Sequence, residues 1–145
     1  MKKAHELNPK SPIISSEFGR NYLYSGKSME AVLYFQKAYE LSDYENPNFI
    51  LRVALAHMYL NETQKGIDVI SQNIEDITEN NRALSFAARC EAKLGNRGQA
   101  YEYLYTLLHR YINPNQYISE YLIADVYAEL KEKDKAFFLA GERDR

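Results

Sequence analysis

A short pattern of two residues recurs four times along the chain, and it constrains the fold more than any other feature. Each copy is a loop-forming residue followed five positions later by a small one. The copies are Gly26–Ala31, Asn61–Gly66, Gly95–Ala100 and Lys131–Ala136. The loop residues lie 35, 34 and 36 positions apart, as the numbers 26, 61, 95 and 131 give. A recurrence of this length predicts a solenoid of similar helical hairpins.

Small and large residues recur around each loop in the way that two closely packed helices require. A small residue precedes each loop by seven positions, as Gly19, Ala54, Ala88 and Ala124. A large apolar residue follows the second small residue by four positions, as Phe35, Ile70 and Leu104, whereas the fourth copy has Ala140. Steps of three and four residues return to one side of an α-helix. We therefore expect the two helices of each copy to cross at their small residues.

The prolines support the same register, because Pro9, Pro12, Pro47 and Pro114 all fall at boundaries between copies. The helices predicted from this register span residues 12–25, 28–42, 47–60, 63–77, 81–94, 97–111, 116–131 and 133–140. Short loops between them predict that consecutive helices lie antiparallel and stack into a right-handed superhelix. The predicted fold class is all-α, without strands.

The spacing of Phe18, Gly19, Tyr22, Gly26 and Ala31 resembles that of the tetratricopeptide repeat (TPR) family. The resemblance implies an α-α superhelix, a TPR solenoid of about four helix-turn-helix repeats. These repeats would span about residues 12–46, 47–80, 81–116 and 117–145 and form a single domain, 12–145. Residues 1–11 resemble the tail of a preceding repeat, because Ala4, Leu7 and Pro9 match the end of one. We therefore expect the chain to be a fragment of a longer protein.

Residues 5–20 and 117–137 resemble a narrower group, the carboxyl-terminal TPR region of bacterial signalling and transcription-regulator proteins. In that group the repeats follow a winged-helix DNA-binding domain, an adenylate cyclase domain or a protein kinase domain. The resemblance implies a regulatory or interaction module of a bacterial signal-transduction protein, attached to an output domain that this sequence does not contain. The chain departs from the group where Phe137-Phe138-Leu139-Ala140 runs into Gly141 and a charged tail.

Composition and charge argue against several classes of protein. Apolar residues make up 46 % and charged residues 26 %, which is typical of globular domains. The net charge of −2 argues against direct binding of nucleic acid by the chain as a whole. No stretch approaches the ~18 apolar residues of a membrane span. The lone Cys90 forms no internal disulfide, which fits a reducing compartment. We expect a cytoplasmic protein without a membrane partner.

No residue pattern indicates catalysis, a metal site or a cofactor. The three histidines fall in different repeats without a ligand-type neighbour, and His57 occupies a slot that should face the core. Cys90 lies beside small residues on a first helix and should be a buried, inert thiol. The stretch 95–98 follows no predicted strand and is not a phosphate loop. We therefore predict that the chain is not an enzyme.

In the TPR family the first helices of successive repeats line a concave groove in which ligands lie. The resemblance places ten residues there: Arg20, Tyr24, Leu51, Leu55, Tyr59, Arg82, Arg89, Lys93, Tyr121 and Asp125. The same register also holds Ser16, Ser85 and Glu129. Arg82, Arg89 and Lys93 share one helix face, beside an apolar and aromatic strip on the preceding first helix. Such a groove suits an extended protein segment or peptide with acidic and apolar side chains.

Two alternatives stay open at this stage. Asp125 and Glu129 occupy the repeat positions of Arg89 and Lys93, one helix over, so these charges could pair with one another as surface salt bridges. The function could also be intramolecular, with the repeats holding or oligomerising a DNA-binding or adenylate cyclase output domain.

The residues near the carboxyl end predict that the chain associates weakly with a second copy to form a homodimer. Residues 137–139, Phe-Phe-Leu, span about 200° of a helix, so one side cannot bury all of them. The alternative is that Phe138 folds back over the fourth repeat and the chain stays monomeric.

Overall fold

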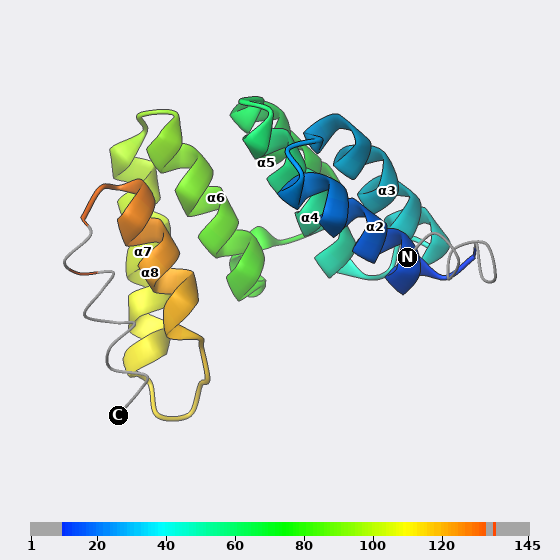
Figure 1. The fold of residues 1–145 in the computed structure, drawn as a ribbon. Coiled ribbons are helices and arrows are strands. Elements are labelled where there is room, and N and C mark those ends of the chain that lie inside the picture. Colours follow the sequence, from blue (N-terminus) through cyan, green and yellow to red (C-terminus); the bar gives the residue numbers. More distant parts are fainter. Residues whose placement is uncertain (1–9, 133–134, 136–145) are drawn as a thin grey trace. The chain divides into compact units, whose positions relative to one another are not determined.

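The computed structural model describes residues 10–132 and Lys135, and this part of the chain is helical, with no strand (Figure 1). The predicted all-α class is therefore confirmed. The α-helices are α2 (Pro12–Tyr24), α3 (Ser28–Leu41), α4 (Pro47–Tyr59), α5 (Thr63–Asn73), α6 (Asn81–Lys93), α7 (Arg97–Ile112) and α8 (Glu120–Glu129), with a 3-10 turn, η1 (Ile77–Glu79). No helix in the described ranges is long and apolar enough to cross a membrane.

Most predicted helix boundaries match within one residue, α8 ends at Glu129 instead of residue 131, and the two largest differences have local causes. Helix α5 ends at Asn73 instead of residue 77, because Ile74 is extended and Asp76 starts the 3-10 turn by accepting a hydrogen bond from the Thr78 amide at 2.9 Å. Helix α8 begins at Glu120 instead of residue 116, because the Ser119 hydroxyl caps it by accepting from the Tyr121 amide. The predicted helix 133–140 lies outside the described residues.

The first helices of the first two copies begin with the same signal. The side chains of Ser11 and Asn46 accept hydrogen bonds from backbone amides of the first turn, and proline follows each of them. A proline there costs no helical hydrogen bond, because the first amides of a helix have no partner within it. These two dipeptides therefore set where α2 and α4 begin.

The four recurring loop residues all adopt the left-handed conformation. The φ angles are 78° at Gly26, 61° at Asn61, 88° at Gly95 and 64° at Lys131. At each of them the next amide donates to the carbonyl five residues before it, at 2.8–2.9 Å. This is the hydrogen bond of a Schellman motif, which ends a helix and reverses the chain. The recurrence in the sequence thus marks a recurring backbone turn.

The chain divides into two compact units, of which the first ends at Glu75 and the second begins at Asp76. The division falls close to the boundary predicted between the second and third copies, residues 80 and 81. A single domain over residues 12–145 stays a prediction.

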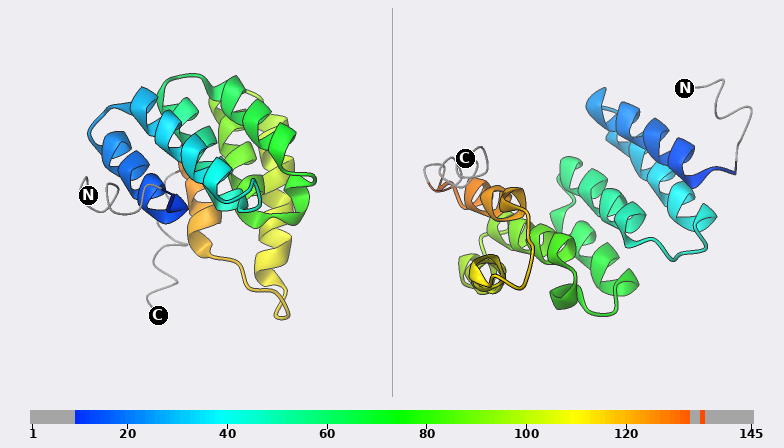
Figure 2. Two further views of the ribbon diagram at one scale, coloured as in Figure 1. Left: turned by 90° about the vertical axis from the view of Figure 1, so that its right-hand side faces the viewer. Right: turned by 90° about the horizontal axis from the view of Figure 1, so that it is seen from below.

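In the first unit, α2 to α5 follow one another, and each helix packs against the next (Figure 1, Figure 2). The core of this unit gathers around the fully buried Phe35, with Ile50 and Val53 from α4. The crossing of α2 and α3 is as close as the small residues predict. A Cβ atom added to Gly19 would lie 2.6 Å from ring carbons of Phe35. Ala31, the other small residue of the crossing, is fully buried.

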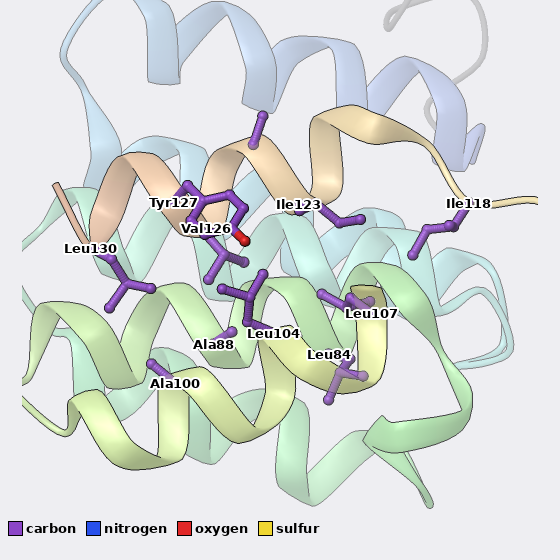
Figure 3. Close-up of a cluster of buried hydrophobic side chains, with 11 residues drawn as sticks. Leu84, Ala88, Ala100, Leu104, Leu107, Ile118, Ile123, Val126, Tyr127 and Leu130 are labelled. Carbon is purple, nitrogen blue, oxygen red and sulfur yellow. The ribbon is translucent and has the colours of Figure 1, made fainter. Parts of the chain in front are cut away.

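In the second unit, α6, α7 and α8 surround a separate core (Figure 3). Figure 3 shows Leu84 and Ala88 of α6, Leu104 and Leu107 of α7, and Val126 of α8 gathered in one cluster. All five are completely buried. Each unit therefore has its own hydrophobic core.

Candidate functional site

The predicted peptide-binding residues fall at fixed distances before the left-handed residue that ends each first helix. Two positions before it lie Tyr24, Tyr59, Lys93 and Glu129. Six positions before it lie Arg20, Leu55, Arg89 and Asp125. Ten positions before it lie Ser16, Leu51, Ser85 and Tyr121, and Arg82 lies thirteen before Gly95. These distances allow the four helices to be compared position by position.

The position two before the turn is the most open of the three. Tyr24 is 77 % exposed and Tyr59 is 61 % exposed, and Lys93 is also exposed. Only Glu129 is largely covered, with its side chain 26 % exposed. A tyrosine that is open to solvent on a helix face can contact a partner through both its ring and its hydroxyl.

In the first and third copies the residue ten positions before the turn, Ser16 or Ser85, packs between successive first helices and is not available for binding. Ser16 and Ser85 are buried. Arg52 Nη1 donates a hydrogen bond to Ser16 Oγ, which joins α4 to α2. Ser85 Oγ donates to the backbone oxygen of Leu122 at 2.7 Å, which joins α6 to α8. Arg52 and Leu122 both lie nine positions before their own turn residue, so the two units use hydrogen bonds between equivalent positions.

The register predicts that Ser16 and Ser85 face a groove, and this prediction is wrong because both side chains are buried. The sequence reasoning missed their packing role, because it treated every position of the first-helix face alike. A signal was present, since a small hydroxyl residue recurs at Ser16 and Ser85 where the second copy has Leu51. Serine fits a close helix contact and supplies both a donor and an acceptor.

The first unit holds five of the ten predicted residues, on α2 and α4. Arg20 Nη1 lies 2.9 Å from Glu17 Oε1, and its guanidinium carbon lies 5.9 Å from the centre of the Tyr24 ring. Leu51 and Leu55 are half-buried on α4, which continues to the exposed Tyr59. This face therefore combines partly open aliphatic side chains with two open tyrosines and one arginine. We call these five residues the tyrosine face.

The second unit holds the other five residues, on α6 and α8. Arg89 Nη2 lies 3.5 Å from Glu129 Oε1, and both side chains are mostly covered. An ion pair across the two helices was one of the alternatives left open by the sequence, and this pair confirms it for Arg89. Arg89 Nε is buried and has no hydrogen-bond partner among the described residues. The guanidinium therefore keeps one buried donor unsatisfied, which costs stability.

The other charged residues of the second unit are more open. Lys93 and Asp125 are exposed, Arg82 is exposed near the start of α6, and Tyr121 is 49 % exposed on α8. Desolvation raises the pKa of Asp125, and the charge of Arg89 opposes that rise. Lys93 makes no ion pair with any residue in the described ranges. We call Arg82, Arg89, Lys93, Tyr121 and Asp125 the charged face.

The residues considered for chemistry are packed in the way the sequence predicts. His57 is 7 % exposed, and its Nδ1 lies 2.8 Å from Glu62 Oε2. Cys90 is fully buried, and desolvation raises the pKa of its thiol to about 12. A thiol with that pKa is not a nucleophile near neutral pH. Among the described residues no group of three or more His, Cys, Asp or Glu side chains could hold a metal ion.

The ten residues thus divide into five on each compact unit. Each unit presents a face built from two successive first helices, which are joined by a hydrogen bond of the serine ten positions before the turn; Ser16 accepts it and Ser85 donates it. A continuous groove across both faces stays a prediction. In comparisons with known proteins, no protein-family model matches the chain and no curated protein matches it significantly.

Proposed function

We propose that the chain is a TPR solenoid that acts as a protein–protein interaction module in the bacterial cytoplasm. It binds an extended segment of a partner along the exposed faces of its first helices. Two regularities support the solenoid: the left-handed turn residues at 26, 61, 95 and 131, and the hydrogen bonds between equivalent positions of α2 and α4 and of α6 and α8. Similar hairpins that stack through similar contacts are what a solenoid requires.

The observation that carries the binding role is the exposure of the tyrosine face. Tyr24 and Tyr59 occupy equivalent positions on α2 and α4, and both are more than half exposed. A tyrosine side chain can bury about 150–250 Å², so a ring that belonged to the core would be covered by its neighbours. Tyrosine and arginine are also enriched in protein interfaces. A repeated open aromatic position is therefore better explained by a partner than by the core.

The partner segment has apolar and acidic side chains. Its apolar side chains contact Leu51 and Leu55 on the tyrosine face of the first unit. Acidic side chains of a partner pair with Lys93 and Arg82 on the charged face of the second unit, where Lys93 is exposed. Exposed charges contribute little to affinity individually, so the apolar contacts supply most of the binding energy.

A peptide array tests this proposal directly. Twelve-residue peptides that combine acidic and apolar residues are screened against the folded chain, and hits are measured by fluorescence anisotropy. We expect Tyr24→Ser with Tyr59→Ser to weaken binding about tenfold or more, since interface aromatics commonly contribute over ~1 kcal/mol each. Lys93→Glu should weaken it less, and the loss should fade in high salt.

The control is Lys10→Glu, which makes the same charge change at an exposed residue before α2. It should leave the affinity unchanged. Peptides that bind the wild type and the Tyr24→Ser/Tyr59→Ser variant equally would contradict the proposed surface. Binding of a DNA-binding or adenylate cyclase domain, with no binding of any peptide, would support the intramolecular alternative instead.

A further inference from the structure

A hollow of about 750 Å³ lies in the first unit, away from the tyrosine face. It forms where the α2–α3 turn and the start of α3 meet the end of α4 and the start of α5. Its volume lies within the range of ~300–1,000 Å³ that small-molecule sites usually have. None of the ten predicted peptide-binding residues lines it. It is therefore a separate feature of the molecule.

Apolar side chains supply much of the lining. Met29 and Leu33 lie one turn apart on α3 and are 71 % and 69 % exposed. Val32 and Leu60 line the same hollow and are partly buried. Single exposed apolar residues are common on proteins, but a concave group of four is typical of a ligand site. These side chains suit the apolar body of a ligand.

A buried imidazole gives the hollow its polar group. His57 lines the hollow, and its Nδ1 lies 2.8 Å from Glu62 Oε2. An ionised carboxylate only accepts hydrogen bonds, so Nδ1 carries the hydrogen. In the neutral ring the other nitrogen, Nε2, is then an acceptor, and it makes no hydrogen bond with any described residue. Nε2 is not among the buried unpaired side-chain atoms of the described residues, so it is accessible from the hollow and can accept a hydrogen bond from a ligand there.

The charges around the hollow balance one another. The lining includes two lysines, Lys27 and Lys65, and two glutamates, Glu30 and Glu62. Lys65 Nζ lies 3.6 Å from Glu62 Oε2, so part of this charge is already paired. The site therefore favours an uncharged ligand over an anion or a cation. Ser28 also lines the hollow, but no hydrogen bond joins it to His57, so the imidazole is not coupled to a nucleophile.

From the hollow, its four apolar side chains and the open nitrogen of His57, we propose a binding site for a small uncharged organic molecule. This ligand has an apolar, preferably aromatic, body and one hydroxyl or N–H group that donates to His57 Nε2. The site is independent of the peptide-binding role, because the two share no residue.

Two matched probes test the proposal by NMR on the whole ¹⁵N-labelled chain. Indole has an apolar body and one N–H donor, whereas 1-methylindole keeps the body and lacks the donor. Indole should shift the amide signals of Met29, Leu33 and Leu60 in a saturable manner at pH 8, where imidazoles are ordinarily neutral. 1-Methylindole should bind about fivefold more weakly, as expected for one lost hydrogen bond.

Surface variants separate binding from folding. Met29→Ser with Leu33→Ser alters two exposed side chains, so the helix content should stay unchanged while indole binding is lost. The matched control is Ile112→Ser, which removes an apolar side chain that is 73 % exposed on α7 and should leave binding unchanged. Three results would overturn the proposal. They are no saturable shift with indole up to its solubility limit, equal affinity for both probes, or shifts that survive the Met29→Ser/Leu33→Ser change.

Discussion

The repeat of this chain is visible in the backbone angles of individual residues. Glycine holds the left-handed turn position twice, but Asn61 and Lys131 hold it in the other two copies. The left-handed conformation costs a residue with a Cβ atom ~1–2 kcal/mol, and only glycine avoids that penalty. Asparagine tolerates it better than lysine does. The turn at Lys131 is therefore the most strained of the four.

Lys131→Gly should stabilise the protein by about 0.5–1 kcal/mol, because removing the steric penalty of the Cβ atom in the left-handed conformation outweighs the extra flexibility that glycine gives the unfolded chain. Lys131→Ala should give no such gain, since it removes the charge but keeps the Cβ atom. Gly95→Ala should cost about 1 kcal/mol for the same reason. Urea unfolding of the three variants measures these differences. Equal effects of Lys131→Gly and Lys131→Ala would mean that the lysine side chain, and not the turn, is responsible.

The pairing of His57 with Glu62 predicts a dependence of stability on pH. The hydrogen bond from His57 lowers the pKa of Glu62 below its ordinary 4.5. A carboxyl group with a depressed pKa in the folded state adds stability above its unfolded pKa, and this contribution disappears as the pH falls through the folded value. The wild type should therefore lose more stability than Glu62→Gln when the pH drops below 4.5. Thermal unfolding on both sides of that pH compares them, and parallel losses would contradict the expectation.

At the scale of helices, two kinds of contact decide how the elements pack. Within the first hairpin, α2 and α3 approach at Gly19, where the ring of Phe35 fills the space of a missing side chain. Between hairpins, a buried serine on one first helix bonds to the next first helix in both units. Van der Waals contact sets the distance between α2 and α3, and a directional hydrogen bond sets the distance between successive first helices. Both kinds can be tested by single substitutions.

Gly19→Ala should destabilise the protein in spite of the better helix propensity of alanine. The added methyl group would lie 2.6 Å from the ring of Phe35, which is fully buried and cannot move aside freely. Overpacking of this kind costs roughly 1–3 kcal/mol, against a propensity gain of about 1 kcal/mol. The matched control is Gly98→Ala in α7, where no atom lies within 4 Å of the new Cβ. That variant should be neutral or more stable, and equal melting temperatures for the two would be inconsistent with the close crossing.

Ser85→Ala should cost about 0.5–1.5 kcal/mol, because it removes the hydrogen bond from Ser85 to the carbonyl of Leu122 in a partly buried contact between α6 and α8. Ser71→Ala is the control, since Ser71 is exposed on α5. Denaturant unfolding measures both. A cost at Ser85 no larger than that at Ser71 would show that the hydrogen bond does not hold the helices together.

At the scale of the molecule, residues 10–132 form two cores, each built from three or four successive helices. A repeat buries its apolar face only against a neighbour, so the last repeat of a solenoid depends on what covers it. Phe137 and Phe138, on which the predicted self-association rests, lie outside the described residues. The expectation from the sequence can still be tested in solution.

Sedimentation over a series of concentrations should show reversible self-association that Phe137→Ser with Phe138→Ser abolishes, because the sequence predicts that one side of a helix cannot bury all of residues 137–139 and apolar surface left open favours contact with a second copy. The control is Tyr105→Ser, which removes an exposed aromatic side chain from α7. It should leave the sedimentation unchanged. A constant monomer mass for the wild type at every concentration would favour the alternative in which Phe138 folds back.

The sequence by itself determined the helical class, the register and nearly every helix end, because these depend on local interactions. The local signals are left-handed turns, proline at the first helical position, and small residues seven positions before each turn. Each of them acts within one hairpin. Such short-range signals survive in the sequence as a periodic pattern. They predicted α2, α3, α4, α6 and α7 to within one residue at each end.

The tertiary structure alone decided which side chains of that register are available to a ligand. Ser16 and Ser85 share the first-helix face with Tyr24 and Lys93, yet they are buried in contacts with the next first helix. Arg89 pairs with a residue forty positions away, and His57 meets Glu62 beside a hollow formed by three helices and their turns. Burial depends on what packs over a position from elsewhere in the chain. A periodic pattern places a residue on a face, but only the neighbouring helix determines whether that face is covered.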